Sequence, residues 1–173
     1  DSRNETFYPT RGRFYTGSVL FYPKFLGSDF EFTHITLDLR EFFPAWGKWG
    51  AIAAQLYGEF AIGSPPFYKY PALGGSNRMR GYFYGRFRDK AYVTVQVEYR
   101  RHLWWKLGGV LFLGVGQVGP ELSAYRLDSF HVSSGIGLRY LFNPEEHVNI
   151  RIDYGSGRND TTNGIYFGVE EAF

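Results

Sequence analysis

Polar and apolar residues alternate along much of this chain of 173 residues. The alternation is clearest in Ala91–Leu103, where Thr94, Gln96 and Glu98 share one parity and the valines between them share the other. A period of two places successive side chains on opposite faces of a β-strand, whereas a helix would spread these polar residues around its whole circumference. The segment therefore predicts a strand with one polar face and one apolar face.

The same pattern predicts seven further strands, each about ten residues long, the length that a tilted strand needs to cross a bilayer. The facing of one of them, Gly108–Val118, stays open because both of its faces are apolar or glycine. We therefore expect an all-β fold, a transmembrane antiparallel up-and-down β-barrel of eight strands. The seven further segments are Arg13–Tyr22, Thr33–Phe42, Ala51–Ile62, Gly108–Val118, Val132–Leu141, Val148–Gly155 and Ile165–Phe173.

The connections between these strands alternate between short and long. Short periplasmic turns and longer extracellular loops are typical of outer-membrane barrels. We expect residues 1–10 to form a periplasmic N-terminal arm and residues 11–173 to form the barrel, with a long extracellular loop at residues 63–90. The expected short turns are Phe43–Lys48, Trp104–Lys106 and Asn143–His147, and the longer connections are Gly63–Lys90, Gly119–Phe130 and Ser156–Gly164.

The composition agrees with a barrel. Aromatic residues make up 20 % of the chain, yet the mean hydropathy is only −0.29, as expected when only every second residue of a strand faces lipid. All four tryptophans, Trp46, Trp49, Trp104 and Trp105, lie in or directly beside the expected short turns and indicate an aromatic girdle at the periplasmic boundary. The net charge of +2 is spread along the chain and does not indicate a nucleic-acid partner.

Charged residues on the polar parity are expected to face the lumen. Their signs are mixed, so inside a small barrel they would satisfy one another in a packed network. No nucleophile has an evident base beside it, and no two histidines have the spacing of metal ligands, so we expect neither an enzyme nor a metal or cofactor site. The expected lumen network consists of Asp38, Arg40, Glu59, Glu98, Arg100, Arg139, Arg151 and Asp153, with His34 and Glu170 on the same parity.

An ordered series of motifs resembles a known family. Residues 73–82 read LGGSNRMRGY, GRFRD follows at 85–89 and EYR at 98–100, and the chain begins DSRNETFYPTRG. Over essentially the whole chain this series resembles the BamA-like superfamily of outer-membrane assembly and translocation barrels, also called the bacterial surface antigen family. The motif residues of the long loop are Gly74, Gly75, Arg80, Gly81 and Tyr82.

The resemblance implies a role for the long loop. In the family this motif folds back into the lumen, and its arginine, here Arg80, pairs with an acidic residue of the barrel wall. Gly114 stands where that acidic residue is expected. The resemblance therefore leaves another lumen carboxylate, such as Glu98, Glu59 or Asp153, as the partner of Arg80.

The C-terminus resembles the assembly signal of outer-membrane proteins. Phe167, Val169 and the terminal Phe173 fall on the apolar parity of the last expected strand. We expect these three side chains to face outward, with Glu171 interrupting the outward row close to the periplasmic boundary, where a charge costs little.

The resemblance also implies a function. Its members insert or translocate polypeptides at the outer membrane of Gram-negative bacteria, so the expected partners are outer-membrane lipid and unfolded outer-membrane or secreted polypeptides. Family barrels have sixteen strands and follow periplasmic POTRA domains, whereas this chain supplies only the last eight strands. Two alternatives therefore stay open: a small structural or passive-pore barrel without translocation activity, and the barrel anchor of a secreted passenger.

The size of an eight-stranded barrel limits what its lumen can hold. Eight strands enclose a space that their own side chains just fill, so the loop at 63–90 cannot also fold inside. Either a homodimer joins edge to edge through Arg13–Tyr22 and Ile165–Phe173, or a closed monomer leaves the loop outside. We expect the closed monomer, because closure within one chain needs no partner, and an N-terminus in the periplasm, because the strand count is even.

Overall fold

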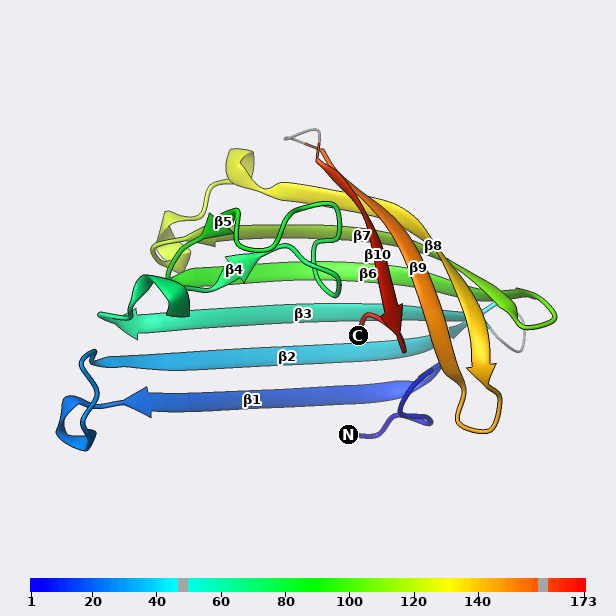
Figure 1. The fold of residues 1–173 in the computed structure, drawn as a ribbon, viewed down its shortest axis with the longest axis horizontal. Coiled ribbons are helices and arrows are strands. Elements are labelled where there is room, and N and C mark those ends of the chain that lie inside the picture. Colours follow the sequence, from blue (N-terminus) through cyan, green and yellow to red (C-terminus); the bar gives the residue numbers. More distant parts are fainter. Residues whose placement is uncertain (47–49, 159–161) are drawn as a thin grey trace.

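The computed structural model describes residues 1–46, 50–158 and 162–173. Eight long antiparallel strands form one sheet in which each strand pairs with its neighbours in sequence (Figure 1). This confirms the all-β antiparallel fold. The strands are β1 (Gly12–Tyr22), β2 (Phe32–Ala45), β3 (Gly50–Gly63), β6 (Ala91–Trp104), β7 (Leu107–Gly119), β8 (His131–Asn143), β9 (Val148–Gly157) and β10 (Asn163–Val169).

The longer connections carry the remaining regular elements. A two-stranded sheet of β4 (Ala72–Leu73) and β5 (Phe87–Arg88) lies within the connection between β3 and β6. Single 3₁₀ turns occur at η1 (Lys24–Leu26), η2 (Phe67–Lys69), η3 (Leu122–Ala124) and η4 (Leu127–Ser129). Within the described ranges, no helix combines the length and the apolar character that crossing a bilayer requires.

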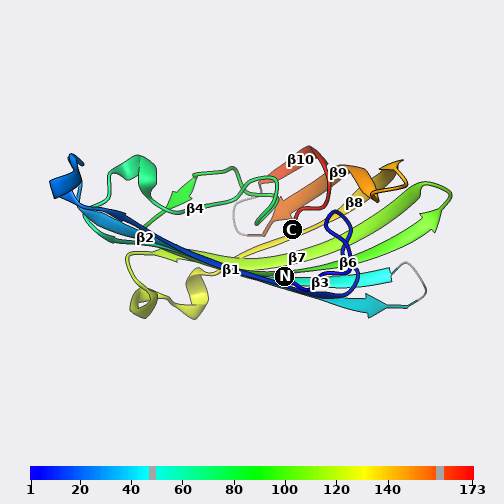
Figure 2. The ribbon, with the colours of Figure 1, turned by 90° about the horizontal axis from the view of Figure 1, so that it is seen from below.

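The large sheet is strongly curved. Its strands twist so that β8, β9 and β10 run across the direction of β1, β2 and β3 (Figure 1). The connection that follows β3, with β4 and β5, lies over the concave side of the sheet (Figure 2). The sheet thus presents a convex outer face and a concave inner face that is covered by its own loop.

The two faces differ in polarity as the alternation predicts. In β6, Val95 and Val97 are 49 % and 41 % exposed on the outer face, whereas Gln96 and Glu98 are 4 % and 0 % exposed on the inner face. In β7, whose facing the sequence left open, Phe112 is buried on the inner face. Exposed apolar side chains line the outer face of every long strand, as in Val19, Leu37, Leu56, Val95, Leu111, Leu138, Ile152 and Phe167.

The sheet is not closed into a barrel. Among the described residues, β1 pairs only with β2 and β10 pairs only with β9. The expectation of a closed eight-stranded monomer is therefore wrong for this structure. The physical reason is that the inner face packs against the long loop, whose Leu73, Met79 and Tyr82 form a buried cluster with Tyr57 of β3 and Tyr92 of β6. This volume is not available inside a cylinder of eight strands.

The last strand is shorter than the alternation predicts. β10 ends at Val169, and Glu170 adopts a left-handed conformation with φ of 70° that turns the chain inward. Phe173 is consequently buried against Phe42 and Ala53 on the inner face, not exposed in the outward row. The outward facing expected for Phe173 is therefore wrong.

The facing of three other residues near the C-terminus can be compared with the expectation. Phe167 and Val169 are strongly exposed on the outer face, as expected. Glu171 was expected to interrupt the outward row, but it lies on the inner face with a side chain that is only 2 % exposed. The alternation ends at Glu170, and the three residues after it, Glu171, Ala172 and Phe173, are all buried on the inner side.

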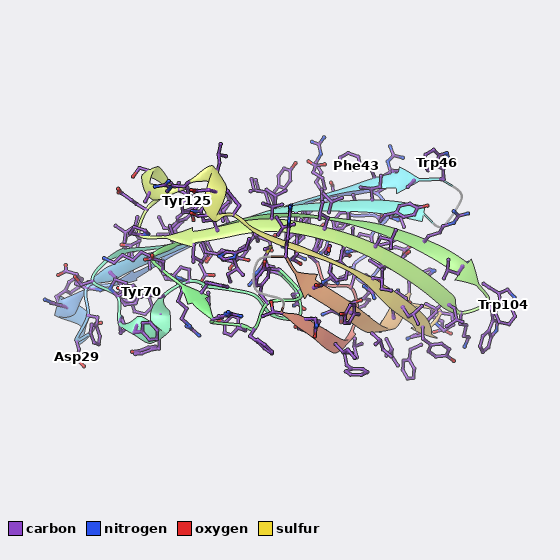
Figure 3. The ribbon with its side chains drawn as sticks, turned by 90° about the horizontal axis from the view of Figure 1, so that it is seen from above. Asp29, Phe43, Trp46, Tyr70, Trp104 and Tyr125 are labelled. Carbon is purple, nitrogen blue, oxygen red and sulfur yellow. The ribbon has the colours of Figure 1, made fainter. Side chains whose placement is uncertain are left out.

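Short turns and long connections lie at opposite ends of the sheet. Phe43, Trp46 and Trp104 mark one end, and Asp29, Tyr70 and Tyr125 lie toward the other (Figure 3). Trp46, Trp104 and Trp105 are strongly exposed, as side chains of an aromatic girdle are. Trp49, which was also assigned to the girdle, lies outside the described residues.

Residues 1–10 fold back over the short-turn end. The backbone N–H of Ser2 donates to the carbonyl oxygen of Arg13 at 2.8 Å, and that of Asn4 donates to the carbonyl oxygen of Arg11 at 3.0 Å. Gly12 permits this close approach: its φ is 109°, and a Cβ there would lie 2.2 Å from the Ser2 carbonyl oxygen. The arm is thus held against the start of β1.

Candidate functional site

The long loop reaches the inner face through tight turns at glycines of its motif. Gly74 and Gly75 have φ of 102° and 117°, which side-chain-bearing residues rarely adopt. The N–H of Gly75 donates to the carbonyl oxygen of Tyr82 at 3.1 Å, which closes the motif into a compact turn. Residues between these glycines and Tyr82 are thereby presented to the sheet, with Met79 and Arg80 almost fully buried.

Arg80 joins two strands that lie far apart in the sequence. Its guanidinium forms an ion pair with Glu98 of β6, and its Nη1 donates to Oδ2 of Asp153 in β9 at 2.6 Å. The same group stacks 3.7 Å above the ring of Phe112 in β7. Buried charges need such partners, because a lone buried charge costs several kcal/mol. Arg80 therefore fixes the loop to the middle of the inner face.

The third carboxylate suggested by the resemblance lies elsewhere. Glu59 of β3 accepts a hydrogen bond from the Tyr57 hydroxyl at 3.0 Å and contacts Nε2 of His34 at 3.0 Å. Glu59 and His34 thus form a separate pair within the described residues. Glu98 and Asp153 together take the place of the single acidic partner that the family pattern led us to expect.

Three further arginines complete the charged network around Arg80. Arg100 donates to Glu98 at 2.8 Å, and Arg139 and Arg151 donate to Asp153 at 2.5 Å and 3.0 Å. The carboxylate of Glu171 accepts from Arg139 at 2.7 Å, and Asn149 also donates to it at 3.0 Å. The network therefore sets four arginines (Arg80, Arg100, Arg139 and Arg151) against three carboxylates (Glu98, Asp153 and Glu171).

Asp38 and Arg40 belong to a second polar chain that also ends on the loop. Arg40 donates to Asp38 at 2.7 Å, and the side-chain amide of Gln55 donates to the same carboxylate at 2.7 Å. Gln96 then donates to Gln55 at 2.7 Å and to the carbonyl oxygen of Asn77 in the loop at 2.9 Å. Gln96 lies on the polar parity of Ala91–Leu103, but neither Gln55 nor Gln96 was among the expected site residues.

Glycines of both the wall and the loop let the loop backbone come close to the sheet. A Cβ on Gly155 would lie 2.6 Å from the carbonyl carbon of Arg80, and one on Gly81 would lie 2.5 Å from the carbonyl carbon of Ser156. Gly114, at the position of the expected acidic residue, has Met79 over it, and a Cβ there would lie 3.1 Å from Sδ. A larger residue at Gly114 would displace the loop.

Hydrogen bonds from the wall fix the motif backbone. The hydroxyl of Ser133 donates to the carbonyl oxygen of Arg80 at 2.5 Å. The hydroxyl of Tyr166 accepts from the N–H of Gly81 at 2.8 Å, and that of Tyr82 donates to the carbonyl oxygen of Val132 at 3.0 Å. No sequence signal pointed to Ser133 or Tyr166, because their roles depend on where the loop lies.

The arrangement positions a loop instead of presenting reactive groups. The carboxylates and guanidinium groups are directed at one another and are nearly inaccessible to solvent. Among the described residues, no group of three or more His, Asp or Glu side chains is placed to hold a metal ion. The site therefore acts as a mechanical lock between the loop and β6, β7 and β9.

Comparison with known proteins agrees with this geometry. No curated protein matches the chain. Among solved structures, the crystal structure of BamA from Haemophilus ducreyi lacking POTRA domains 1–3 is similar, with a TM-score of 0.74 and 15 % sequence identity. The match covers 98 % of this chain and 39 % of that chain, so the present chain spans well under half of the relative. The sequence pattern of the Omp85 superfamily domain matches residues 1–173, and the chain therefore belongs to the Omp85 superfamily.

Proposed function

We propose that this chain forms half of a transmembrane wall that inserts or translocates polypeptides at the outer membrane, and that a second copy supplies the other half. Membership of the Omp85 superfamily places the chain in the outer membrane of a Gram-negative bacterium and gives it a family role in outer-membrane protein insertion or translocation. The observation that carries the proposal is a motif loop locked on the inner face of a sheet whose two edges are unpaired.

The outer face and the ends of the sheet support an orientation in the membrane. Exposed apolar side chains cover the outer face, as expected where strands meet lipid. Trp46, Trp104 and Trp105 lie at the short-turn end, where β1 begins and β10 ends. With short turns on the periplasmic side, both chain termini and the arm of residues 1–10 are periplasmic.

The unpaired edges of the sheet, at β1 and β10, are the reason for proposing a second copy. An unpaired N–H or C=O group in lipid costs several kcal/mol, so an edge strand cannot stay open in the membrane. β1 and β10 run antiparallel to each other across the sheet. Two copies related by a two-fold axis therefore pair β1 of each with β10 of the other, closing a sixteen-stranded wall without free edges. The larger lumen has room for both loops.

Disulfide trapping tests the closure. Val19 of β1 and Ile165 of β10 both face outward from the edge strands. We expect Val19→Cys in one tagged copy and Ile165→Cys in a differently tagged copy to crosslink in lipid vesicles at low protein concentration. Val95→Cys, on the outer face of the central strand β6, is the matched control and should not crosslink with either. Disulfides formed only within a chain that carries both Val19→Cys and Ile165→Cys would overturn the two-copy wall.

Reconstitution tests the activity. Vesicles that contain the protein should fold an unfolded outer-membrane protein faster than empty vesicles do. Asp153→Asn, which breaks the loop lock, should abolish the difference, whereas Asp128→Asn, in an exposed surface pair with Arg126, should leave it intact. Absence of acceleration together with leakage of small ions from the vesicles would show a passive pore and contradict the proposal.

A further inference from the structure

The N-terminal arm covers the first part of the free edge of β1. The backbone N–H of Arg13 donates to Oγ of Ser2 at 3.1 Å, and the Arg13 carbonyl oxygen accepts from the N–H of Ser2 at 2.8 Å. The arm lies on the side of β1 away from β2 (Figure 1), so these groups of Arg13 point to the free edge. In an antiparallel strand, the N–H and C=O groups of every second residue point to the same edge. The following residues of β1 that face the free edge are therefore Tyr15, Gly17, Val19 and Phe21.

Both ends of this free segment are defined by the chain itself. At the periplasmic end, Oδ1 of Asn4 accepts from the N–H of Arg11 at 2.9 Å, next to the contacts between Ser2 and Arg13. The arm thus satisfies the edge with side chains and does not continue along β1 as a strand. At the other end Pro23 follows β1, and a proline has no N–H to donate. The edge that is available to a partner runs from Tyr15 to Phe21.

The free edge of β10 has the same length. On the side of β9, the carbonyl oxygen of Thr162 accepts from the N–H of Gly157 at 2.8 Å, and the N–H of Glu170 donates to the carbonyl oxygen of Asn149 at 2.7 Å. The even-numbered residues of β10 therefore face β9, and the left-handed Glu170 then takes the chain away from the edge. The residues that face the free edge are Asn163, Ile165, Phe167 and Val169.

The facing of the side chains restricts how the two edges can meet. Tyr15 and Val19 are exposed on the outer face of β1, and Ile165 and Phe167 are exposed on the outer face of β10. A slip of one residue would set outward side chains of one strand against inward side chains of the other. Only registers that differ by two residues therefore remain possible.

We propose that two copies of the chain join in a single register, and that the arm and the turn at Glu170 are the stops that set it. In this register Tyr15 lies opposite Val169 of the other copy, Gly17 opposite Phe167, Val19 opposite Ile165, and Phe21 opposite Asn163. The inference rests on the two-copy wall proposed above and specifies how its seams are built.

The neighbouring registers are excluded by the two ends of β1. A shift of two residues in one direction would place Val169 against Arg13, whose N–H and C=O groups are already bonded to Ser2. A shift in the other direction would place Asn163 against Pro23, which lacks the donor, and would leave Tyr15 without a partner. The proposed register alone pairs every free position on both edges.

Side chains on the two faces fit the same register. On the outer face, Gly17 has no contact closer than 3.8 Å at its Cβ position, which leaves room for the exposed ring of Phe167. Aromatic side chains that cover an edge glycine in this way help to fix a register. On the inner face, Leu20 is 50 % exposed although its surroundings are polar. It lies opposite Gly164, whose Cβ position is covered by the ring of Tyr166, so this ring is the apolar partner of Leu20.

Disulfide rates between differently tagged copies in lipid vesicles test the register. Val19→Cys with Ile165→Cys is the directly opposed pair, and Val19→Cys with Phe167→Cys and Gly17→Cys with Ile165→Cys report the two shifted registers. Opposed Cα atoms lie about 5.5 Å apart, within disulfide range, whereas positions shifted by two residues lie about 7–8 Å apart. We expect the opposed pair to crosslink several-fold faster than either shifted pair. Heat-modifiable migration of each variant confirms that it is folded.

The role of the arm is tested by removing its side-chain acceptors. Ser2→Ala/Asn4→Ala weakens the cover over Arg13, and a register that uses Arg13 in place of Phe21 then also pairs four edge positions. We expect crosslinking between Gly17→Cys and Ile165→Cys to become several-fold faster in this background. Thr6→Ala, which changes an exposed side chain of the same arm, is the matched control and should leave all three rates unchanged.

The outcomes separate the register from the wall. Fastest crosslinking by a shifted pair in the wild-type background would overturn the register and leave the two-copy wall standing. An unchanged pattern in Ser2→Ala/Asn4→Ala would show that the arm is not a stop and would overturn that part of the proposal. Absence of disulfides between copies for all three pairs would overturn the two-copy wall and the register with it.

Discussion

Arg80 of the motif loop and Asp153 of β9 are separated by 73 residues in the sequence, yet Arg80 Nη1 lies 2.6 Å from Asp153 Oδ2. Both side chains are buried, and Asp153 is also contacted by Arg139 and Arg151. One carboxylate thus contacts three guanidinium groups, whereas Arg80 is one of four cations that share three anions. The two partners of this contact are therefore not equivalent.

This inequality predicts an asymmetric mutational response. Asp153→Asn leaves three buried arginines short of negative charge and should lower the free energy of unfolding by about 3–5 kcal/mol. Arg80→Gln leaves Glu98 paired with Arg100 and removes the excess cation, so it should cost less, about 1.5–3 kcal/mol for the lost charged hydrogen bonds. Urea titrations in lipid vesicles measure both. Equal costs, or a larger cost for Arg80→Gln, would contradict this charge balance.

The close approach of loop and wall predicts a second effect. Gly155→Ala would place a methyl group 2.6 Å from the carbonyl carbon of Arg80, so the loop must move away from the wall. Residues 64–90 should then become sensitive to protease in folded protein. Gly17→Ala is the control, because its nearest contact is 3.8 Å away, and it should leave the loop protected. If the loop of Gly155→Ala stays protected from protease, the added methyl group is instead accommodated by a shift of β9, which contradicts the prediction.

The two faces of β1 predict a contrast between neighbouring residues. Val19 is exposed on the outer face, so Val19→Arg puts a charge toward lipid and should cost about 2–4 kcal/mol if it lies near the bilayer midplane. Ser18 has the opposite parity and is itself exposed, so Ser18→Arg should be tolerated. Folding yield in vesicles at increasing urea separates the two. A greater loss for Ser18→Arg would reverse the assigned facing.

Tyr8 predicts a pH dependence in the arm. Burial, with the Glu171 carboxylate nearby, raises the pKa of Tyr8 from 10.0 to about 12. Because the docked state favours the neutral phenol, its contribution to docking is complete below pH 10 and is lost as the pH rises toward 12. The difference in phenolate absorbance between the wild type and Tyr8→Phe should have its midpoint near 12. A midpoint near 10 would mean that Tyr8 is not buried in the folded protein.

The eight long strands of the sheet, the facing of most of them and the family were predictable from the sequence. The period of two in Ala91–Leu103 follows from local stereochemistry, since alternate side chains of a strand must face opposite sides. That parity alone was enough to predict that Glu98 and Arg100 face inward. The motif at Gly74–Tyr82 identified the loop that enters the inner face, because its glycines and arginine are contiguous in the chain.

Tertiary structure alone decided which inner charges meet. Parity assigns Glu59, Glu98 and Asp153 to the same face equally well, and only the curvature of the sheet brings Glu98 and Asp153 to Arg80 and leaves Glu59 with His34. The open edges likewise could not be inferred from alternation, because alternation specifies the faces of a strand and not its neighbours.

The C-terminus shows the limit of periodic reasoning most directly. Phe167 and Val169 obey the alternation, but the left-handed residue Glu170 then ends it, so Glu171 joins the inner network and Phe173 is buried. A single backbone dihedral, stabilised by contacts with Arg139 and Phe42 from distant strands, overrides a local pattern. The sequence determined which residues can face lipid, because that depends on the strand period, whereas long-range packing and charge pairing determined where the last strand stops.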